Sequence, residues 1–239
     1  MKRLLSLFLT LMTPLGGCKV PVAREIVFVP DISKSIDADA ERQMFAAIED
    51  VAQHLRRGDT LTIVPITGNA KAELQGRTLR YSVPTEESRQ AYDADLRTLH
   101  DQIKNDLVRL QTDALAHPGE HTDIIGSIRI AMKEFSLKPS DKRLIVLSDF
   151  IQDDSQFDFR KDNKLAGEAQ ATALAKCLIA HRDANPVVTV ILGRLRSNEF
   201  SSLTLNRQRA IEEFWAQVMF PADVEADGTE AALRALVNN

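Results

Sequence analysis

The sequence predicts an α/β protein with a doubly wound, mostly parallel sheet, helices on both faces and one antiparallel edge strand. Short apolar runs rich in β-branched residues alternate with longer segments whose apolar residues recur at helical spacing. The short runs are typical of strands covered on both faces, and the longer segments of helices that pack one face on a sheet. Their alternation predicts right-handed crossovers, which bring the carboxyl ends of the parallel strands to one edge.

Four apolar runs predict the parallel strands, at residues 26–29, 61–66, 144–147 and 187–192. Each is short, continuous and largely β-branched, as expected for a strand buried on both faces. Residues 77–83 instead alternate between polar and apolar side chains, which predicts an antiparallel edge strand after the second run.

Four further segments have the 3.6-residue periodicity of helices that bury one face. Their marker residues are Met44, Ile48, Val51 and Leu55; Ile124, Ile128, Met132 and Phe135; Leu174, Ala175 and Leu178; and Ile211, Phe214, Trp215 and Val218. Residues 86–114 predict a longer helix, which would span roughly 40 Å. It is either an elongated surface helix packed by one stripe or a protruding arm that binds a partner.

The N-terminal residues have the pattern of a signal peptide. Lys2 and Arg3 form a positive start, and residues 4–12 are almost wholly apolar. This run is too short to span a bilayer but suits the core of a signal peptide. The stretch Leu-Gly-Gly-Cys that ends at Cys18 resembles a bacterial lipobox, in which the cysteine is acylated and becomes the first residue. A plain secretory signal with an incidental cysteine is the alternative.

This pattern divides the chain into residues 1–17, a lipoprotein signal peptide, 18–23, a lipidated N-terminus with a short tether, and 24–239, one domain. The protein would be exported and held at the periplasmic face of the cell envelope by lipid on Cys18. In a Gram-negative host, Lys19 after the cysteine favours the outer membrane.

The totals describe an ordinary globular protein. Of 239 residues, 44% are hydrophobic and 27% are charged, which argues against global disorder. The formal net charge is −4, which gives no support to nucleic-acid binding. Removing residues 1–17 takes away two basic residues and no acid, so the formal net charge changes from −4 to −6. Because the mature chain is acidic overall, we expect no polybasic attraction between its surface and anionic lipid.

Three smaller features carry expectations of their own. Cys177, the one cysteine besides Cys18, lies in an Ala-rich helical pattern, which favours a buried, inert thiol. The basic pairs at residues 56–57 and 142–143 flank strands and are expected to be solvated ends. His117 and His121 lie in a loop, where we expect solvated side chains.

Polar residues gather where the predicted strands and loops reach the carboxyl edge of the sheet. The first strand runs into an Asp-x-Ser-x-Ser segment with Asp31, Ser33 and Ser35. Thr122 directly precedes a predicted helix, and Asp149 follows the third apolar run. A hard divalent cation such as Mg²⁺ prefers about six oxygen ligands and retains several waters. Two carboxylates and three hydroxyls, without sulfur or imidazole, fit that preference.

These motifs resemble those of the von Willebrand factor type A (vWA) family. The metal-ion-dependent adhesion site of that family uses Asp-x-Ser-x-Ser, a Thr and an Asp in this order. The resemblance includes the Asp-Ile-x-Gly-x-Ile start of the helix after Thr122, and it covers nearly all of the chain from Arg24 onward. It implies a vWA/Rossmann-like fold and bound Mg²⁺, with Mn²⁺ and Ca²⁺ as alternatives. It also implies a protein partner whose acidic residue completes the metal shell.

Two features depart from the family pattern. Phe150 follows the last metal-site Asp, where the family often has Gly, which puts the closure of this loop in doubt. The long helix at residues 86–114 exceeds the usual pattern and could reshape the rim of the site.

The function expected from these residues is binding rather than catalysis, with an unknown protein as the ligand. A metal-dependent phosphoesterase using Asp31 is one alternative, but Ser33 stands where Asp-x-Asp phosphatases have their second acid. The chain also has no Gly-x-Ser-x-Gly elbow and no Gly-rich phosphate loop. A structural envelope component with a non-functional metal site is the other alternative.

Overall fold

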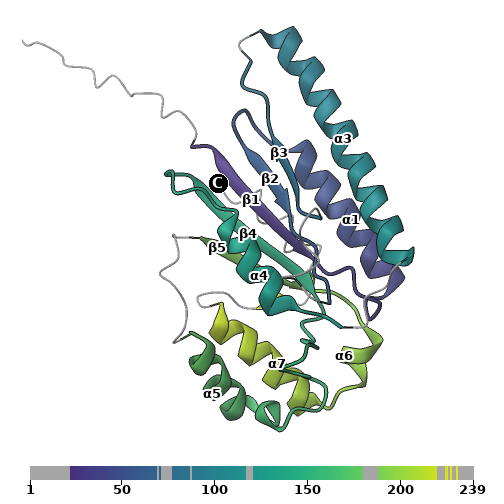
Figure 1. Cartoon of the computed structure of the whole chain (residues 1–239), viewed down its shortest axis with the longest axis vertical. Helices are drawn as coiled ribbons and strands as arrows, with labels where there is room; N and C mark the ends of the chain where they lie inside the picture. The colour runs from purple at the N-terminus through teal and green to yellow at the C-terminus, as the bar shows by residue number, and fades with distance from the viewer. Residues whose placement is uncertain are drawn as a thin grey trace, which may run out of the picture.

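The computed structural model describes residues 22–68, 70, 77–86, 88–116, 121–179, 188–219, 224–225, 227 and 230. Six strands of this part form one sheet in the order β3-β2-β1-β4-β5-β6 (Figure 1). They are β1 (Arg24–Pro30), β2 (Thr60–Ile63), β3 (Leu79–Ser82), β4 (Asp141–Ser148), β5 (Thr189–Arg194) and β6 (Val224–Glu225). The edge strand β3 is antiparallel to β2, and all other neighbours are parallel. This confirms the predicted fold class, whereas β6 was not predicted.

Helices cover both faces of the sheet. They are α1 (Ala38–Gln53), α3 (Arg89–Ala116), α4 (Ile124–Lys133), α5 (Glu168–Ile179), α6 (Asn198–Ser202) and α7 (Leu205–Val218). The side chains of β1 alternate between two cores. Ile26 and Phe28 pack with α1 and α3, while Val27 and Val29 face the core that includes α4, α5 and α7. The predicted helices are therefore present, with α6 as an addition.

The long helix α3 lies along the outside of α1 (Figure 1). It buries one stripe, formed by Leu99, Ile103, Leu107, Leu110 and Ala114. This is the packing expected of an elongated surface helix. Among the described residues, no helix combines the length and the apolar character needed to cross a bilayer.

Two expectations from the sequence are wrong. The thiol of Cys177 is exposed. Helix α5 buries Ala171 and Ala175, and Cys177 lies two residues after Ala175, roughly 200° around the helix and therefore on the opposite face. Lys142 and Arg143 are buried rather than solvated. Arg143 pairs with Asp141 at 2.6 Å, and Lys142 lies opposite a glutamate of β1, so their charges are matched inside the sheet edge. Cys18 and residues 1–17, and also His117, lie outside the described residues.

A buried ion pair fixes the start of β1. The guanidinium of Arg24 donates to Asp59 through Nε at 2.8 Å and Nη2 at 2.6 Å, and both side chains are almost fully buried. Asp59 also accepts the backbone N–H groups of Arg24 and Arg56, at 2.8 Å each. The loop before β2 is therefore held to the first residue of β1.

Asp59→Ala should lower the free energy of unfolding by about 3–5 kcal/mol, because it leaves the Arg24 charge buried without its partner. Urea unfolding followed by circular dichroism measures this. The control is Arg42→Ala, which breaks the exposed Arg42–Asp39 pair and should change stability by less than about 1 kcal/mol. Equal effects of the two substitutions would contradict the role given to the buried pair.

Candidate metal centre

Asp31 is the first residue after β1 and is fully buried. Its backbone N–H donates to the carbonyl of Leu147 at 2.8 Å, which ties it to β4. Both carboxylate oxygens accept a hydrogen bond: Oδ1 from the N–H of Ser33 at 2.9 Å, and Oδ2 from the hydroxyl of Ser148 at 2.5 Å. Burial nevertheless raises the pKa of Asp31, and the bonds from Ser148 and Ser33 oppose the rise.

Ser33 and Ser35 present their hydroxyls on the same side of the loop. Their Oγ atoms are 3.0 Å apart, and both residues are half-buried, whereas Lys34 between them is exposed. The N–H of Ile36 closes the turn by donating to the carbonyl of Ser33 at 3.3 Å. The alternating pattern therefore places two hydroxyl oxygens together, as the sequence predicts.

Asp149 follows β4 and is also fully buried. Its Oδ1 accepts the N–H of Ile151 at 3.0 Å, but its Oδ2 has no hydrogen-bond partner among the described residues. Burial, and then the nearby charge of Asp31, raise the pKa of Asp149 to about 7. The hydroxyls of Ser197 and Ser35 oppose this rise, so both lie beside the carboxylate.

Thr122 is buried on a neighbouring loop. It forms a two-way backbone bridge with Asp153, at 2.7 and 2.9 Å. The next residue, Asp123, donates its N–H to the carbonyl of Thr67, and Thr67 follows Ile66, the bridge partner of Asp31. The structure thus groups Asp31, Ser33, Ser35 and Asp149 by direct interactions. It connects Thr122 to them through the backbone, with no recorded side-chain bond to the other four.

Three buried polar residues that hold these loops were not predicted from the sequence. Ser148 bonds Asp31, and Ser197 lies beside Asp149 and pairs with Ile36 in a bridge. Gln152, fully buried, accepts the N–H of Ile125 and donates to Asp123. A serine or glutamine near a strand end is common in any loop, so only the adjacency of β1, β4 and β5 reveals these roles.

The start of α4 leaves room only for glycine at its third position. Asp123 caps the helix by accepting the N–H of Gly126 at 2.8 Å. A Cβ at Gly126 would lie 2.1 Å from Oδ2 of Asp123. The Asp-Ile-x-Gly-x-Ile segment thus serves the cap that positions the Thr122 loop.

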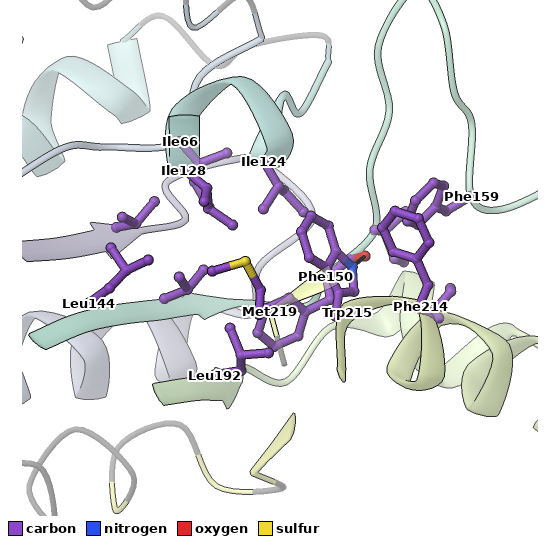
Figure 2. Packing of buried hydrophobic residues seen from close by; sticks show 14 of the residues in the cluster. Ile66, Ile124, Ile128, Leu144, Phe150, Phe159, Leu192, Phe214, Trp215 and Met219 are labelled. Carbon is purple, nitrogen blue, oxygen red and sulfur yellow. Dashed lines mark hydrogen bonds between the residues drawn. The ribbon is translucent and has the colours of Figure 1, made fainter. Parts of the chain in front are cut away.

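Phe150 explains how the loop after Asp149 closes without glycine. Its φ is +63°, in the left-handed region that favours glycine. Its N–H donates to the Ser148 hydroxyl at 2.9 Å, and its carbonyl accepts the indole N–H of Trp215 at 2.9 Å. The ring packs against Trp215, with ring centroids 5.8 Å apart, in the core that also contains Phe159 and Phe214 (Figure 2). Aromatic burial therefore offsets a backbone strain of about 1–2 kcal/mol.

A charged network forms the outer rim beside Thr122. Arg160 contacts Asp153 at 2.6 Å, Asp158 at 3.0 Å and Glu199 at 3.5 Å. Burial alone would raise the pKa of Asp158, but the bonds from Arg160 and Lys161 outweigh it and lower the pKa to about 2. The acids of the rim are thus occupied by cationic side chains, unlike the two carboxylates inside.

The side chains gathered here carry the oxygen donors that a hard cation prefers. No cluster of three or more His, Cys, Asp and Glu side chains with metal-binding geometry occurs in the described part of the chain. A site here would depend on two carboxylates and neighbouring hydroxyls, which suits Mg²⁺. The buried Oδ2 of Asp149 has no hydrogen-bond partner among the described residues, and a buried oxygen of this kind is stabilised by a positively charged ligand.

Comparisons with known proteins support the fold. No protein-family model matches the chain, and no curated protein matches its sequence. The pilus adhesin SpaC from Lactobacillus rhamnosus GG superposes with a TM-score of 0.52 at 11% identity, over 92% of this chain and 30% of that one. BatB from Bacteroides thetaiotaomicron gives 0.46 at 11% identity, over 90% and 96%. A von Willebrand factor type A structure from Catenulispora acidiphila gives 0.44 at 16%, over 90% and 41%. The strand order and the likeness to SpaC show a doubly wound, Rossmann-like α/β fold.

Replacing Phe150 should reverse the usual order of alanine and glycine in a protein core. Both substitutions lose the buried ring, at a cost of about 3–5 kcal/mol for Phe→Ala. Glycine also relieves the positive φ, so Phe150→Gly should be about 1 kcal/mol more stable than Phe150→Ala. Chemical denaturation of both variants measures the difference. A more stable alanine variant would show that the backbone is not strained.

Asp149→Asn should stabilise the protein in chelator at pH 8 and much less at pH 4. Because folding raises the pKa of this carboxyl from 3.8 to about 7, the stability that the protonated group contributes is present below about pH 3.8 and is lost as the pH rises to 7. The gain at pH 8 should be roughly 1–3 kcal/mol, since one pKa unit corresponds to about 1.4 kcal/mol. Thermal or urea unfolding at both pH values tests it. A variant less stable than the wild type at pH 8 would contradict the pairing of like charges.

Proposed function

We propose that the protein is a vWA-like binding module that uses Mg²⁺, or Mn²⁺ or Ca²⁺, to capture an acidic residue of a partner protein. The ligands would be Asp31, Ser33, Ser35, Thr122 and Asp149. The observation that carries the proposal is the pair of buried carboxylates with one unpartnered oxygen at the strand ends. When bound, the cation supplies positive charge that a carboxylate from outside can share.

The residues of the chain divide this task. Asp149 offers a free oxygen, while both oxygens of Asp31 already accept protein hydrogen bonds, so that Asp31 contributes mainly negative charge at a fixed position. The half-buried hydroxyls of Ser33 and Ser35 face the same place from the loop after β1. Few of the ligands are charged, which leaves the cation with net attraction for an acidic partner. No catalytic residue is assigned.

The second part of the proposal concerns location. The pattern of residues 1–17 and Cys18 supports export and lipid attachment at the cell envelope. A fold shared with a bacterial pilus adhesin agrees with a binding role at a cell surface. Mass spectrometry of the mature N-terminus tests the lipid on Cys18 directly.

The partner test is affinity capture from solubilised host envelope with Mg²⁺ and with chelator. The wild type should retain a specific protein only with the cation, and Asp31→Asn and Asp149→Asn should retain at least ten-fold less. Asp95→Asn, which changes an exposed carboxylate on α3, is the matched control and should behave as the wild type. Capture that persists unchanged in chelator, or in both site variants, would refute the proposal.

A further inference from the structure

The end of the sheet opposite the candidate metal centre has its own surface character. We call it the basal end: it is formed by Val22 and Ala23, the loop at residues 54–59 and the loop at residues 134–140. The carbonyl of Ala23 accepts the N–H of Asp141 at 3.1 Å, so the chain enters β1 beside the second loop. All residues before Val22, including the apolar stretch 4–12, join the domain at this end.

Two aliphatic side chains of the basal end face solvent. Leu137 is 99% exposed and Val22 is 65% exposed. The exposure of Leu137 is built into the loop, because Glu25 holds the residues on either side of it. Its carboxylate accepts the N–H of Ser136 at 2.7 Å and the hydroxyl of Ser140 at 2.6 Å. The loop is therefore fixed in a form that projects an apolar side chain outward.

Basic side chains lie in or next to both loops of the basal end. Arg56, Arg57, Lys133 and Lys138 are all exposed. Arg57 lies over the ring of Tyr92 at 4.3 Å, which leaves its charge at the surface.

Three acids at or near this end each have a cationic partner. Asp59 is buried against Arg24, Glu25 lies opposite Lys142, and Glu134 pairs with Arg80 at 2.7 Å. Glu86 is an exposed acid before α3. The basal end thus has a positive surface on a chain whose formal net charge is −4. The net charge of the whole chain does not reveal this local excess of exposed basic side chains.

We propose that the basal end docks onto an anionic lipid surface, with Leu137 and Val22 inserted among headgroups and Arg56, Lys133 and Lys138 against lipid phosphates. Exposed apolar side chains ringed by basic ones are the combination that interfacial membrane binding uses. The chain enters β1 at this end, so the proposed lipid on Cys18 would bring the bilayer to it. The docked domain points its candidate metal centre away from the membrane, at the far ends of β1 and β4 (Figure 1). The docking does not depend on the proposed metal.

Lipid-borne quenchers test this docking in the full chain. Leu137→Trp places an indole at the basal end, and Leu205→Trp is the control, because Leu205 is 69% exposed at the start of α7 near the other end. The native Trp215 is fully buried and gives the same background in both variants. Each protein is reconstituted into vesicles of phosphatidylcholine and phosphatidylglycerol that carry a headgroup-level spin-labelled lipid. We expect strong quenching and a blue shift at position 137 and neither at position 205.

Charge reversal supplies the second arm. Each basic residue near an anionic surface strengthens attachment by about five-fold, so Arg56→Glu with Lys138→Glu should abolish the quenching of Leu137→Trp. Arg209→Glu, an exposed reversal on α7, should leave it unchanged. Vesicles of phosphatidylcholine alone should also quench less. Equal quenching at positions 137 and 205 would overturn the proposal, and it is the result expected if this surface binds a protein instead of lipid. Quenching that depends neither on lipid charge nor on charge reversal would also overturn it.

Discussion

The structure depends on two carboxylates buried at the ends of neighbouring strands. Asp31 and Asp149 lie in the interior, and no cationic side chain of the described residues is among the causes that set their pKa values. Hydrogen bonds from Ser148 and from backbone N–H groups hold both in place, but they do not remove the mutual repulsion. As proposed above, a cation bound between the two carboxylates would offset this repulsion and so stabilise the fold.

Asp149 is followed by a strained backbone conformation at Phe150, which contacts with the rest of the domain stabilise. Phe150 adopts a backbone conformation suited to glycine, and its ring and carbonyl are both fixed by the aromatic core, above all by Trp215 of α7. The site and the packing of α7 on the sheet are therefore energetically connected through one residue. Glycine would adopt this turn without strain. Here the packing of the Phe150 ring stabilises the same turn by more than the strain costs.

Much of the fold could be predicted because strands buried on both faces and helices buried on one face have different periodicities. The four parallel strands and the antiparallel edge are present near the predicted positions, and so is the grouping of Asp31 with Asp149. The helical periodicity around Cys177 predicted a buried thiol, but the apolar residues of this helix are not all on one face, and Cys177 lies on the exposed one. Composition gives only the total charge and does not show which charged side chains are buried in pairs, such as Arg24 with Asp59, and which stay exposed. Ser148 and Ser197 could not be singled out, since their partners are distant in sequence.

In the two proposals, the basal end would contact lipid and the candidate metal centre would contact a partner at the opposite end of the domain. We propose that buried Asp31 and Asp149 share one divalent cation. The most direct measurement is titration of Mn²⁺ into the purified protein, followed by electron paramagnetic resonance of free and bound metal. The account predicts one bound ion that Mg²⁺ displaces, and its loss in Asp149→Asn with the fold intact by circular dichroism. Absence of binding to the wild type, or equal binding to the variant, would contradict it.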